Sequence, residues 1–519
     1  MIVVALALFV LLPGDPVRPV AAGERTASSP APPRPTQAEV ADRFLVAFGK
    51  GDAAAAAALT DDPAAATKTL SAVWQGLGPT AVTTSRTGAQ GDAVTFTITW
   101  TLGPQRVWSY GSTMTTARTG EDWRVHWDPV LVHPKLTAER GLTLRGPIGT
   151  PAVLDRDGAP LLVWQAAGPS APDPGLAPLL GPVLARVARE QGGADGWHVA
   201  LVDAAGAEVE RLAGSAGESK PLTSSVSIRV QQAAQGAVNS VAKPARLVAI
   251  RPSTGDILAV AQNGPAGTDT KALNGLYAPG STFKIATASA ALMAGAANPD
   301  TVLPCPGSAT IGTRTIGNDD GFALGDVPLH TAFARSCNTT FGKLAADLGP
   351  DALNQAAARL GLTADFVVPG LTTEAGAVEP APSTAQRVEN GIGQGTVRLS
   401  PFGVALMSAT VASGRAVVPR LWRDLPTTVT TGYQPPPRAV LDQLRGMMRE
   451  VVTAGTGRGL SGRGAVFGKT GTAQFGDGSA AHGWFTGYRG DLAWAVLVEE
   501  AGSSGPAVAV SSAFLGAVG

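Results

Sequence analysis

Hydrophobic and polar positions follow two different spacings in the first part of the chain. From Ala38 to Leu59, in AEVADRFLVAFGKGDAAAAAAL, apolar residues recur at the spacing of a helix. Three later segments alternate apolar and polar residues as strands do: DAVTFTITWTL, RVWSYGSTMTTART and EDWRVHWDPVLVHPKL. A helix followed by alternating strands predicts a small α+β domain, which we place at residues 37–140.

The pattern loosens after this domain and then becomes densely apolar. Two short strands are predicted on either side of the turn DRDG at residues 155–158, and the Pro/Gly-rich stretch GPSAPDPGLAPLLGP follows them. We interpret residues 141–220 as a linking module. Residues 221–519 are richer in apolar helices and strands, with strand hairpins predicted at 246–262, at a sheet edge, and at 482–500, and form one large domain.

The first residues have a composition of their own. An apolar run from Met1 to Leu12 is shorter than the roughly 20 residues that span a bilayer, and it lacks a basic region before it. Pro13, Gly14 and a Pro/Ser/Ala-rich linker at residues 23–36 argue against a buried core helix. We therefore expect residues 1–22 to be an export signal or a membrane anchor whose true start lies upstream.

Composition narrows the classes of function. The formal net charge is zero and charged residues make up 15% of the chain, so no basic surface for nucleic acid is predicted. Only two cysteines occur, Cys305 and Cys337, which is too few for a disulfide framework. They could pair in an oxidising compartment, or both could be free, buried thiols.

A candidate nucleophile lies in YAPGSTFKIATASAALMAG, where a Pro-Gly turn precedes an apolar helix. Ser281 and Lys284 are three residues apart and therefore share one face of the first helical turn. A serine becomes nucleophilic beside a general base, and a lysine serves as that base when burial or a second cation lowers its pKa. A serine and a lysine at this spacing also occur by chance, so this motif alone decides little.

Two later motifs strengthen the hypothesis. ARSCNTTFGKLAADLG places Ser336 and Asn338 just before a helix, where they could cap the helix, serve the site or do both. AVFGKTGTAQFG places Lys469, Thr470 and Gly471 at the end of a strand-like run. The order S-x-x-K, S-x-N, K-T-G corresponds to the set found in penicillin-binding proteins and class A β-lactamases, whose middle motif carries Asp where this chain has Cys337.

With these motifs, and with ENGIGQGTVRLSPFGVALMSATVASG between them, the large domain resembles the transpeptidase domain of class B penicillin-binding proteins. The resemblance implies a multidomain α+β protein, in which an antiparallel sheet flanked by helices forms the large domain. The linking module is similar to the pedestal of that family. The segment WRVHWDPVLVHPKL resembles the end of the nuclear-transport-factor-like domain, a small cone-like α+β fold found in one branch of the family.

The resemblance implies a catalytic role for five residues. Ser281 would be the acylated nucleophile and Lys284 the base that takes its proton. Ser336 would relay the proton toward the leaving amine, and Asn338 would hold Lys284 and the substrate amide. Lys469 would keep the site electropositive, which would lower the pKa of Lys284 and attract the substrate carboxylate.

Three further residues would bind substrate. Thr470 and Thr472 would donate hydrogen bonds to the substrate carboxylate, and Gly471 would leave room for a substrate backbone along the strand. The backbone N–H groups of Ser281 and Thr472 would form the oxyanion hole.

The reaction implied is acyl transfer from the D-Ala-D-Ala end of one peptidoglycan stem peptide to the amine of another. β-Lactams would acylate the same serine, and neither a metal nor an organic cofactor is required. The implied partners are stem peptides, a glycosyltransferase or the division or elongation machinery, and the membrane through the N-terminal segment. The active site is expected to face the cell exterior.

Other functions stay open at this point. A β-lactamase of class A would need a glutamate in an E-x-x-L-N pattern, but GPDALN has Pro350 at that position. A D,D-carboxypeptidase that passes the acyl group to water, and a non-catalytic β-lactam sensor or cell-wall scaffold, both remain compatible with the sequence. Cys337, beside the site, is interpreted as a free cysteine that packs in the core.

Overall fold

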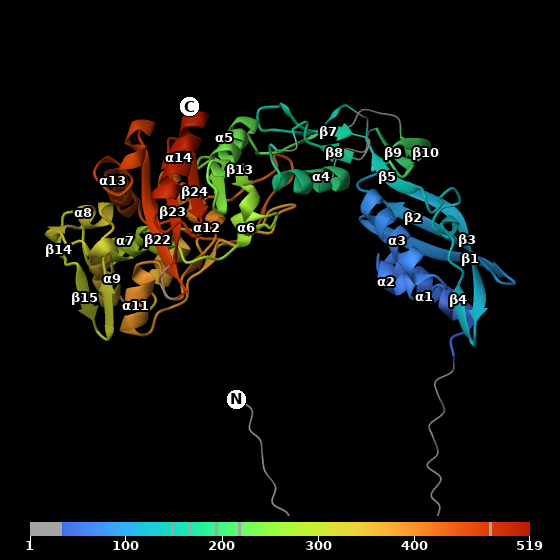
Figure 1. Cartoon of the computed structure of the whole chain (residues 1–519), viewed down its shortest axis with the longest axis horizontal. Coiled ribbons are helices and arrows are strands. Elements are labelled where there is room, and N and C mark those ends of the chain that lie inside the picture. Colours follow the sequence, from blue (N-terminus) through green and yellow to red (C-terminus); the bar gives the residue numbers. More distant parts are fainter. Residues whose placement is uncertain are drawn as a thin grey trace, which may run out of the picture.

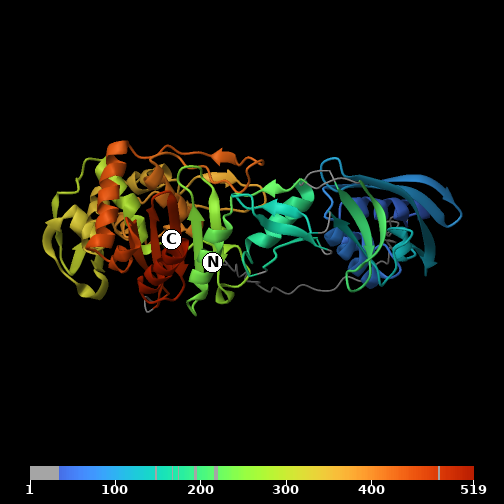
Figure 2. The same ribbon diagram turned by 90° about the horizontal axis from the view of Figure 1, so that it is seen from above.

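A computed structural model describes residues 34–146, 149–165, 168–173, 175–191, 196–215, 220–476 and 480–519. A small domain and a large domain lie at opposite ends of the molecule, with a linking module between them (Figure 1). Figure 2 shows the same arrangement from above. The predicted signal or anchor at residues 1–22 lies outside the described residues. Within the described residues no helix combines the length and apolar character needed to cross a bilayer.

The small domain packs three helices on a four-stranded antiparallel sheet in the order β1-β2-β3-β4. In β2, alternate residues from Val94 to Trp100 are buried against the helices, as the sequence pattern predicted. The single helical stretch expected from Ala38 is two helices, because the chain turns at Gly51 and Asp52 caps a new helix. The bounds are α1 Gln37–Gly49, α2 Ala53–Ala57, α3 Pro63–Leu77, β1 Ala81–Gln90, β2 Ala93–Thr101, β3 Val107–Thr119 and β4 Asp122–Val125.

The last strand predicted for this domain was too long. Strand β4 ends at Val125, and the following residues form a 3₁₀ turn at Pro129–Leu131. Asp128 caps this turn by accepting from the N–H of Val130, and Pro129 fits its first position. The alternation of apolar and polar residues therefore continued past the end of the strand.

The linking module divides its apolar residues between the two neighbouring cores. The sheet β10-β9-β5 contributes Leu142, Leu144 and Val199 to the core of the small domain. The second sheet, β11-β6-β7-β8, and helix α4 pack with the large domain. The two strands expected around residues 155–158 are confirmed as β6 and β7. The bounds are β5 Gly141–Arg145, β6 Pro151–Leu154, β7 Pro160–Gln165, β8 Gly168–Ser170, α4 Leu180–Gln191, β9 Trp197–Val202, β10 Glu208–Ser215 and β11 Leu222–Thr223.

A five-stranded antiparallel sheet, in the order β13-β12-β24-β23-β22, forms the centre of the large domain. Helices α5 and α14 cover one face and α12 covers the other, so nearly every residue of β12, β13 and β24 is apolar and buried. Both predicted hairpins are confirmed, as β12–β13, with β13 at the sheet edge, and as β23–β24. The bounds are α5 Ile228–Asn239, β12 Ala245–Ile250, β13 Ile257–Gln262, α12 Pro401–Ser413, β22 Phe467–Phe475, β23 Ala480–Arg489, β24 Leu492–Val498 and α14 Gly505–Val518.

Strand β22 is the other edge of this sheet, and a second, mostly helical layer lies beyond it (Figure 1). The helices of this layer are α7 Lys284–Met293, α8 Leu329–Ala334, α9 Asn338–Asp347, α10 Ala352–Arg359, α11 Thr384–Gly391 and α13 Arg438–Thr453. Its strands are β14 Val302–Cys305, β15 Ser308–Ile311, β16 Arg314–Gly317 and β17 Gly325–Pro328. Smaller elements are α6 Lys271–Asn274, β18 Asp365–Val367, β19 Gly376–Ala377, β20 Arg398–Leu399 and β21 Thr428–Thr431.

Candidate active site

The candidate nucleophile lies on a tight turn and not on the helix itself. Ser281 is part of a 3₁₀ turn at Gly280–Phe283, and α7 begins at Lys284. Gly280 has a φ of 53°, and a Cβ added there would lie 2.4 Å from the carbonyl oxygen of Thr472. Its N–H donates to the carbonyl oxygen of Gly393 at 3.0 Å. The turn is thus wedged between β22 and the loop after α11, in a conformation that favours glycine.

Lys284 is completely buried and is held by the loop of the second motif. Its Nζ donates to the carbonyl oxygen of Ser336 at 2.8 Å and to Asn338 Oδ1 at 2.6 Å, with Ser336 Oγ at 3.4 Å. Burial, and secondarily the charge of Lys469, lower the pKa of Lys284 well below its ordinary value. A lysine in this setting can be neutral near pH 7 and can accept a proton.

The second motif adopts an unusual backbone conformation. Ser336 has a φ of 63°, a left-handed value that few residues other than glycine adopt, and Asn338 is the first residue of α9. The sequence left open whether Ser336 or Asn338 caps this helix, and neither does, because Asn338 Oδ1 binds Lys284 and Ser336 Oγ accepts from Lys469. Asn318 supplies the cap: its Oδ1 accepts from the N–H groups of Asn338 at 2.7 Å and Thr339 at 3.1 Å.

The interpretation of Cys337 as a free cysteine is also wrong. Cys337 forms a disulfide with Cys305, and the two Cα atoms are 6.2 Å apart. Strand β14 ends at Cys305 beside the start of α9, so the fold brings the two residues within bridging distance. The disulfide therefore fixes the loop between Ser336 and Asn338 to β14.

The third motif lies on β22 and faces the second. Lys469 is completely buried, and its Nζ donates to Ser336 Oγ at 2.8 Å and to the carbonyl oxygen of Thr470 at 3.1 Å. Burial lowers the pKa of Lys469 to about 7. The hydroxyl of Thr470 lies 2.5 Å from that of Thr456, in the loop after α13. Ser336 therefore contacts both lysines.

The reason expected for Gly471 needs correction. A Cβ at this position would lie 2.7 Å from the carbonyl oxygen of Pro279 and 3.0 Å from Thr282 Cγ2. The space beside Gly471 is thus filled by the nucleophile turn and is not open to a substrate backbone. Glycine is required here because the turn packs directly on the strand.

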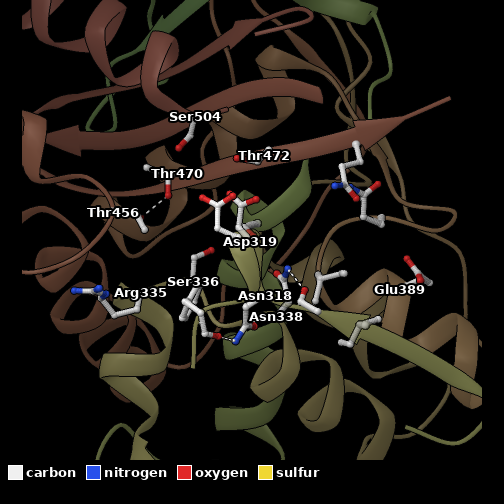
Figure 3. Close-up of a pocket in the computed structure, with 18 of the residues that line it drawn as sticks. Asn318, Asp319, Arg335, Ser336, Asn338, Glu389, Thr456, Thr470, Thr472 and Ser504 are labelled. Carbon is white, nitrogen blue, oxygen red and sulfur yellow. Dashed lines mark hydrogen bonds between the residues drawn. The ribbon is translucent and has the colours of Figure 1, made fainter. Parts of the chain in front are cut away.

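A cleft of about 690 Å³ opens between β22 and the helical layer. Ser281, Ser336, Asn338, Thr470 and Thr472 all line it. Figure 3 shows Ser336 and Asn338 facing Thr470 and Thr472 across the cleft. The side chains of Lys284 and Lys469 lie buried behind its wall.

Several residues of the cleft were not predicted from the sequence. Among those that contact the three motifs or their strand are the loop residues Asn318, Thr456 and Gln394. Asp319 also lines the cleft, and burial together with the charge of Asp320 raises the pKa of its carboxyl. No periodic pattern or turn signal marks these positions, because their contacts depend on segments distant in the sequence.

Comparison with known proteins decides the family. Residues 246–515 match the model of the penicillin binding protein transpeptidase domain, which therefore spans half of the chain. The chain belongs to this family. Residues 36–140 match the NTF2-like N-terminal transpeptidase domain, which agrees with the resemblance seen in the small domain.

Two of the relatives are named peptidoglycan D,D-transpeptidases. The chain is 32% identical over 306 residues to PbpA of Mycobacterium tuberculosis strain H37Rv, covering 49% of this chain and 61% of the relative. It is 33% identical over 330 residues to PbpA of Mycolicibacterium smegmatis, covering 53% of this chain and 66% of the relative. The matches thus span less than two thirds of the length of these relatives.

Solved structures of the same family share the fold. The penicillin G acyl-enzyme complex of penicillin-binding protein A from M. tuberculosis is 27% identical, with a TM-score of 0.50, and covers 59% of this chain and 82% of that structure. Pseudomonas aeruginosa PBP2, in complex with WCK 5153, is 23% identical with a TM-score of 0.56, covering 71% and 96%. The multidomain α+β class, with its large penicillin-binding domain, is confirmed.

Proposed function

We propose that this chain is a D,D-transpeptidase that cross-links peptidoglycan stem peptides through an acyl-enzyme on Ser281. The observation that carries the proposal is the joint contact of Lys284 and Lys469 with Ser336, behind a cleft that exposes Ser281. Two buried lysines with lowered pKa values supply a neutral base and an electropositive site together. The names of the relatives, peptidoglycan D,D-transpeptidases, support the same reaction.

In the first half of the reaction, neutral Lys284 accepts the proton of Ser281 while Oγ attacks the carbonyl carbon of the penultimate D-Ala. The C–N bond to the terminal D-Ala breaks, and the leaving amine receives a proton relayed through Ser336. In the second half, the amine of another stem peptide attacks the ester carbonyl. The new amide bond forms, and Ser281 Oγ leaves and regains its proton. A β-lactam would acylate Ser281 by the same attack, with opening of its ring.

The remaining site residues would bind and orient the donor. Thr470, Thr472 and charged Lys469 would hold the terminal carboxylate, and Asn338 would hold the donor amide. The N–H groups of Ser281 and Thr472 would stabilise the oxyanion. In enzymes with such a site, removing one donor lowers the rate by about 10²–10³.

The substrate also defines where the chain would work. Stem peptides lie outside the cell membrane, so the cleft would face the exterior, with residues 1–22 as signal or anchor. A glycosyltransferase, or the division or elongation machinery, would supply and place the glycan strands that carry these peptides.

The test is product analysis with the purified chain, a D-Ala-D-Ala stem peptide as donor and a stem peptide with a free amine as acceptor. We expect a cross-linked product whose amount rises with acceptor concentration, and none with Ser281→Ala. Hydrolysed donor at every acceptor concentration would instead identify a D,D-carboxypeptidase. Penicillin acylation without any turnover of the peptide would identify a sensor.

A further inference from the structure

The outer edge of β22 is the surface along which an extended peptide could pair. On an edge strand, every second residue points its backbone N–H and C=O away from the sheet. The carbonyl oxygen of Thr472 points this way, because it faces the nucleophile turn at Gly280. Thr470 and Gln474 have the same parity as Thr472, so the backbone groups of all three residues point to this edge, where the carbonyl oxygen of Thr470 already accepts from Lys469 Nζ.

Gln394 occupies this edge near the C-terminal end of β22. With the Gln394 side-chain amide oriented so that both of its groups find a partner, its Oε1 accepts from the N–H of Gln474 at 2.9 Å and its Nε2 donates to the carbonyl oxygen of Gln474 at 3.2 Å. A side-chain amide thus takes both backbone groups of Gln474 that a further residue of an extended peptide would need. Both residues line the cleft.

The loop that carries Gln394 is firmly held. The N–H of Gln394 donates to the carbonyl oxygen of Glu389 at 3.0 Å. Buried Asn390 accepts from the N–H of Thr396 at 3.0 Å through its Oδ1, which closes the loop. The neighbouring Gly393 accepts from Gly280 of the nucleophile turn. The amide of Gln394 is therefore presented to β22 at a fixed position relative to Ser281.

The proposed function sets the direction of the donor. Its terminal carboxylate would lie by Lys469 and Thr470, and its scissile carbonyl by Ser281 and Thr472. The donor therefore runs antiparallel to β22, and its residues before the scissile bond extend toward Gln474. The acyl residue is the first residue before the scissile bond. If it pairs with Thr472, the second residue before the bond lies opposite Ala473 and the third lies opposite Gln474.

We infer that Gln394 is a specificity-determining residue that limits strand pairing to the two donor residues before the scissile bond. This inference rests on the proposed function and adds to it a limit on the length of the recognised peptide. Donors extended by a third α-linked residue gain no backbone hydrogen bonds, because Gln394 already occupies the N–H and C=O groups of Gln474.

The experiment uses two penicillins that acylate Ser281 and differ in their 6-acylamino group. One carries a phenylacetyl group, and the other carries acetyl-L-alanyl-glycyl, which continues the peptide to the third upstream residue. The second-order acylation constant of each is measured by intact-protein mass spectrometry for the full chain, for Gln394→Ala and for Gln386→Ala. Gln386 is the matched control, because its amide contacts the same loop, at Thr396, but among the described residues forms no hydrogen bond with β22.

We expect the acylation constant of the long penicillin, divided by that of the short one, to rise about tenfold in Gln394→Ala. This factor corresponds to one or two neutral hydrogen bonds. The ratio in Gln386→Ala should equal that of the parent chain. Gln394→Ser replaces Gln394→Ala if the latter does not fold. An unchanged ratio in the Gln394 variant would overturn the inference while leaving the proposed function intact. Failure of the parent chain to form an adduct with either penicillin would overturn both.

Discussion

At the scale of single residues, the site depends on two buried lysines that share one serine. Lys284 contacts the carbonyl oxygen of Ser336, and Lys469 contacts its hydroxyl. Burial disfavours the charge on each lysine, and a charge on Lys469 further disfavours one on Lys284. The pair can thus hold one proton, on Lys469, while Lys284 stays neutral and basic.

This arrangement predicts an unusual pH dependence. The acylation constant of benzylpenicillin should fall about 25-fold between pH 6.5 and 8.5, because Lys469 loses the charge that binds the carboxylate as pH passes its free-enzyme pKa of about 7. Lys284 cannot cause this fall, since a general base that loses its proton as pH rises gains activity, and burial lowers the pKa of Lys284. The acylation constant is measured across this pH range by stopped-flow or quenched-flow kinetics.

Lys469→Arg is the control for this prediction, because a guanidinium stays charged across the range. The fall should disappear in this variant even if its constant is lower overall. A constant that rises steadily to pH 9 in the parent chain would contradict the assignment of the charge to Lys469.

The sequence motifs identified the residues proposed to carry the chemistry, but not those that position them. Ser281, Lys284, Ser336 and Lys469 were predicted because their types and order correspond to a known set. Asn318 was not, since its cap on α9 comes from a loop twenty residues upstream of Asn338 and follows no local rule. The interpretation of Cys337 as a free cysteine was wrong for the same reason, because its pairing with Cys305 depends on where β14 lies.

At the scale of elements, the nucleophile turn is positioned by β22 and by the loop after α11. Gly280 lies at the contact between them, with left-handed φ and no room for a side chain. The sequence predicted a turn before the helix from Pro279 and Gly280, but not that the turn would be packed on both sides.

Gly280→Ala should lower the acylation constant at least 100-fold, because its Cβ would push the turn away from Thr472. Gly295→Ala is a matched control: Gly295 has a φ of 64°, but an added Cβ meets no atom within 4 Å. Gly295→Ala should lose about 1 kcal/mol of stability from the left-handed backbone, and Gly280→Ala should lose more because its Cβ also meets Thr472. Equal acylation by the two variants would show that the close contact does not position Ser281.

The disulfide joins two elements across 32 residues and holds the loop of the second motif. Replacing both Cys305 and Cys337 with serine should lower the free energy of unfolding of the large domain by about 2–4 kcal/mol. Because the loop carries Ser336 and Asn338, acylation should also slow. Denaturant unfolding followed by tryptophan fluorescence, with and without reductant, checks this. A parent chain indifferent to reductant in both measurements would contradict a stabilising role.

At the scale of the whole molecule, the chain has separate apolar cores at its two ends. The core of the small domain includes part of the linking module, and the other part belongs to the large domain. The sequence predicted the small domain, the large domain and a looser region between them. It did not predict how the looser region divides, because its short strands carry no signal of the core they join.

Separate cores predict two thermal unfolding transitions by calorimetry. Acylation by benzylpenicillin should shift only the transition of the large domain upward, since the adduct lies in its cleft. The midpoint temperature of the small-domain transition should not change within experimental error. A single transition that shifts as a whole would contradict independent cores, and Ser281→Ala, which should show no shift, is the control.

The central claim is that Ser281 is an acyl-transfer nucleophile, and one measurement tests it directly. Intact-protein mass spectrometry after incubation with benzylpenicillin should show one adduct of the mass of the drug, stable over hours and located on Ser281 by peptide mapping. Ser281→Ala should show none. An adduct of equal yield in Ser281→Ala, or one mapped to another residue of the parent chain, would contradict the account.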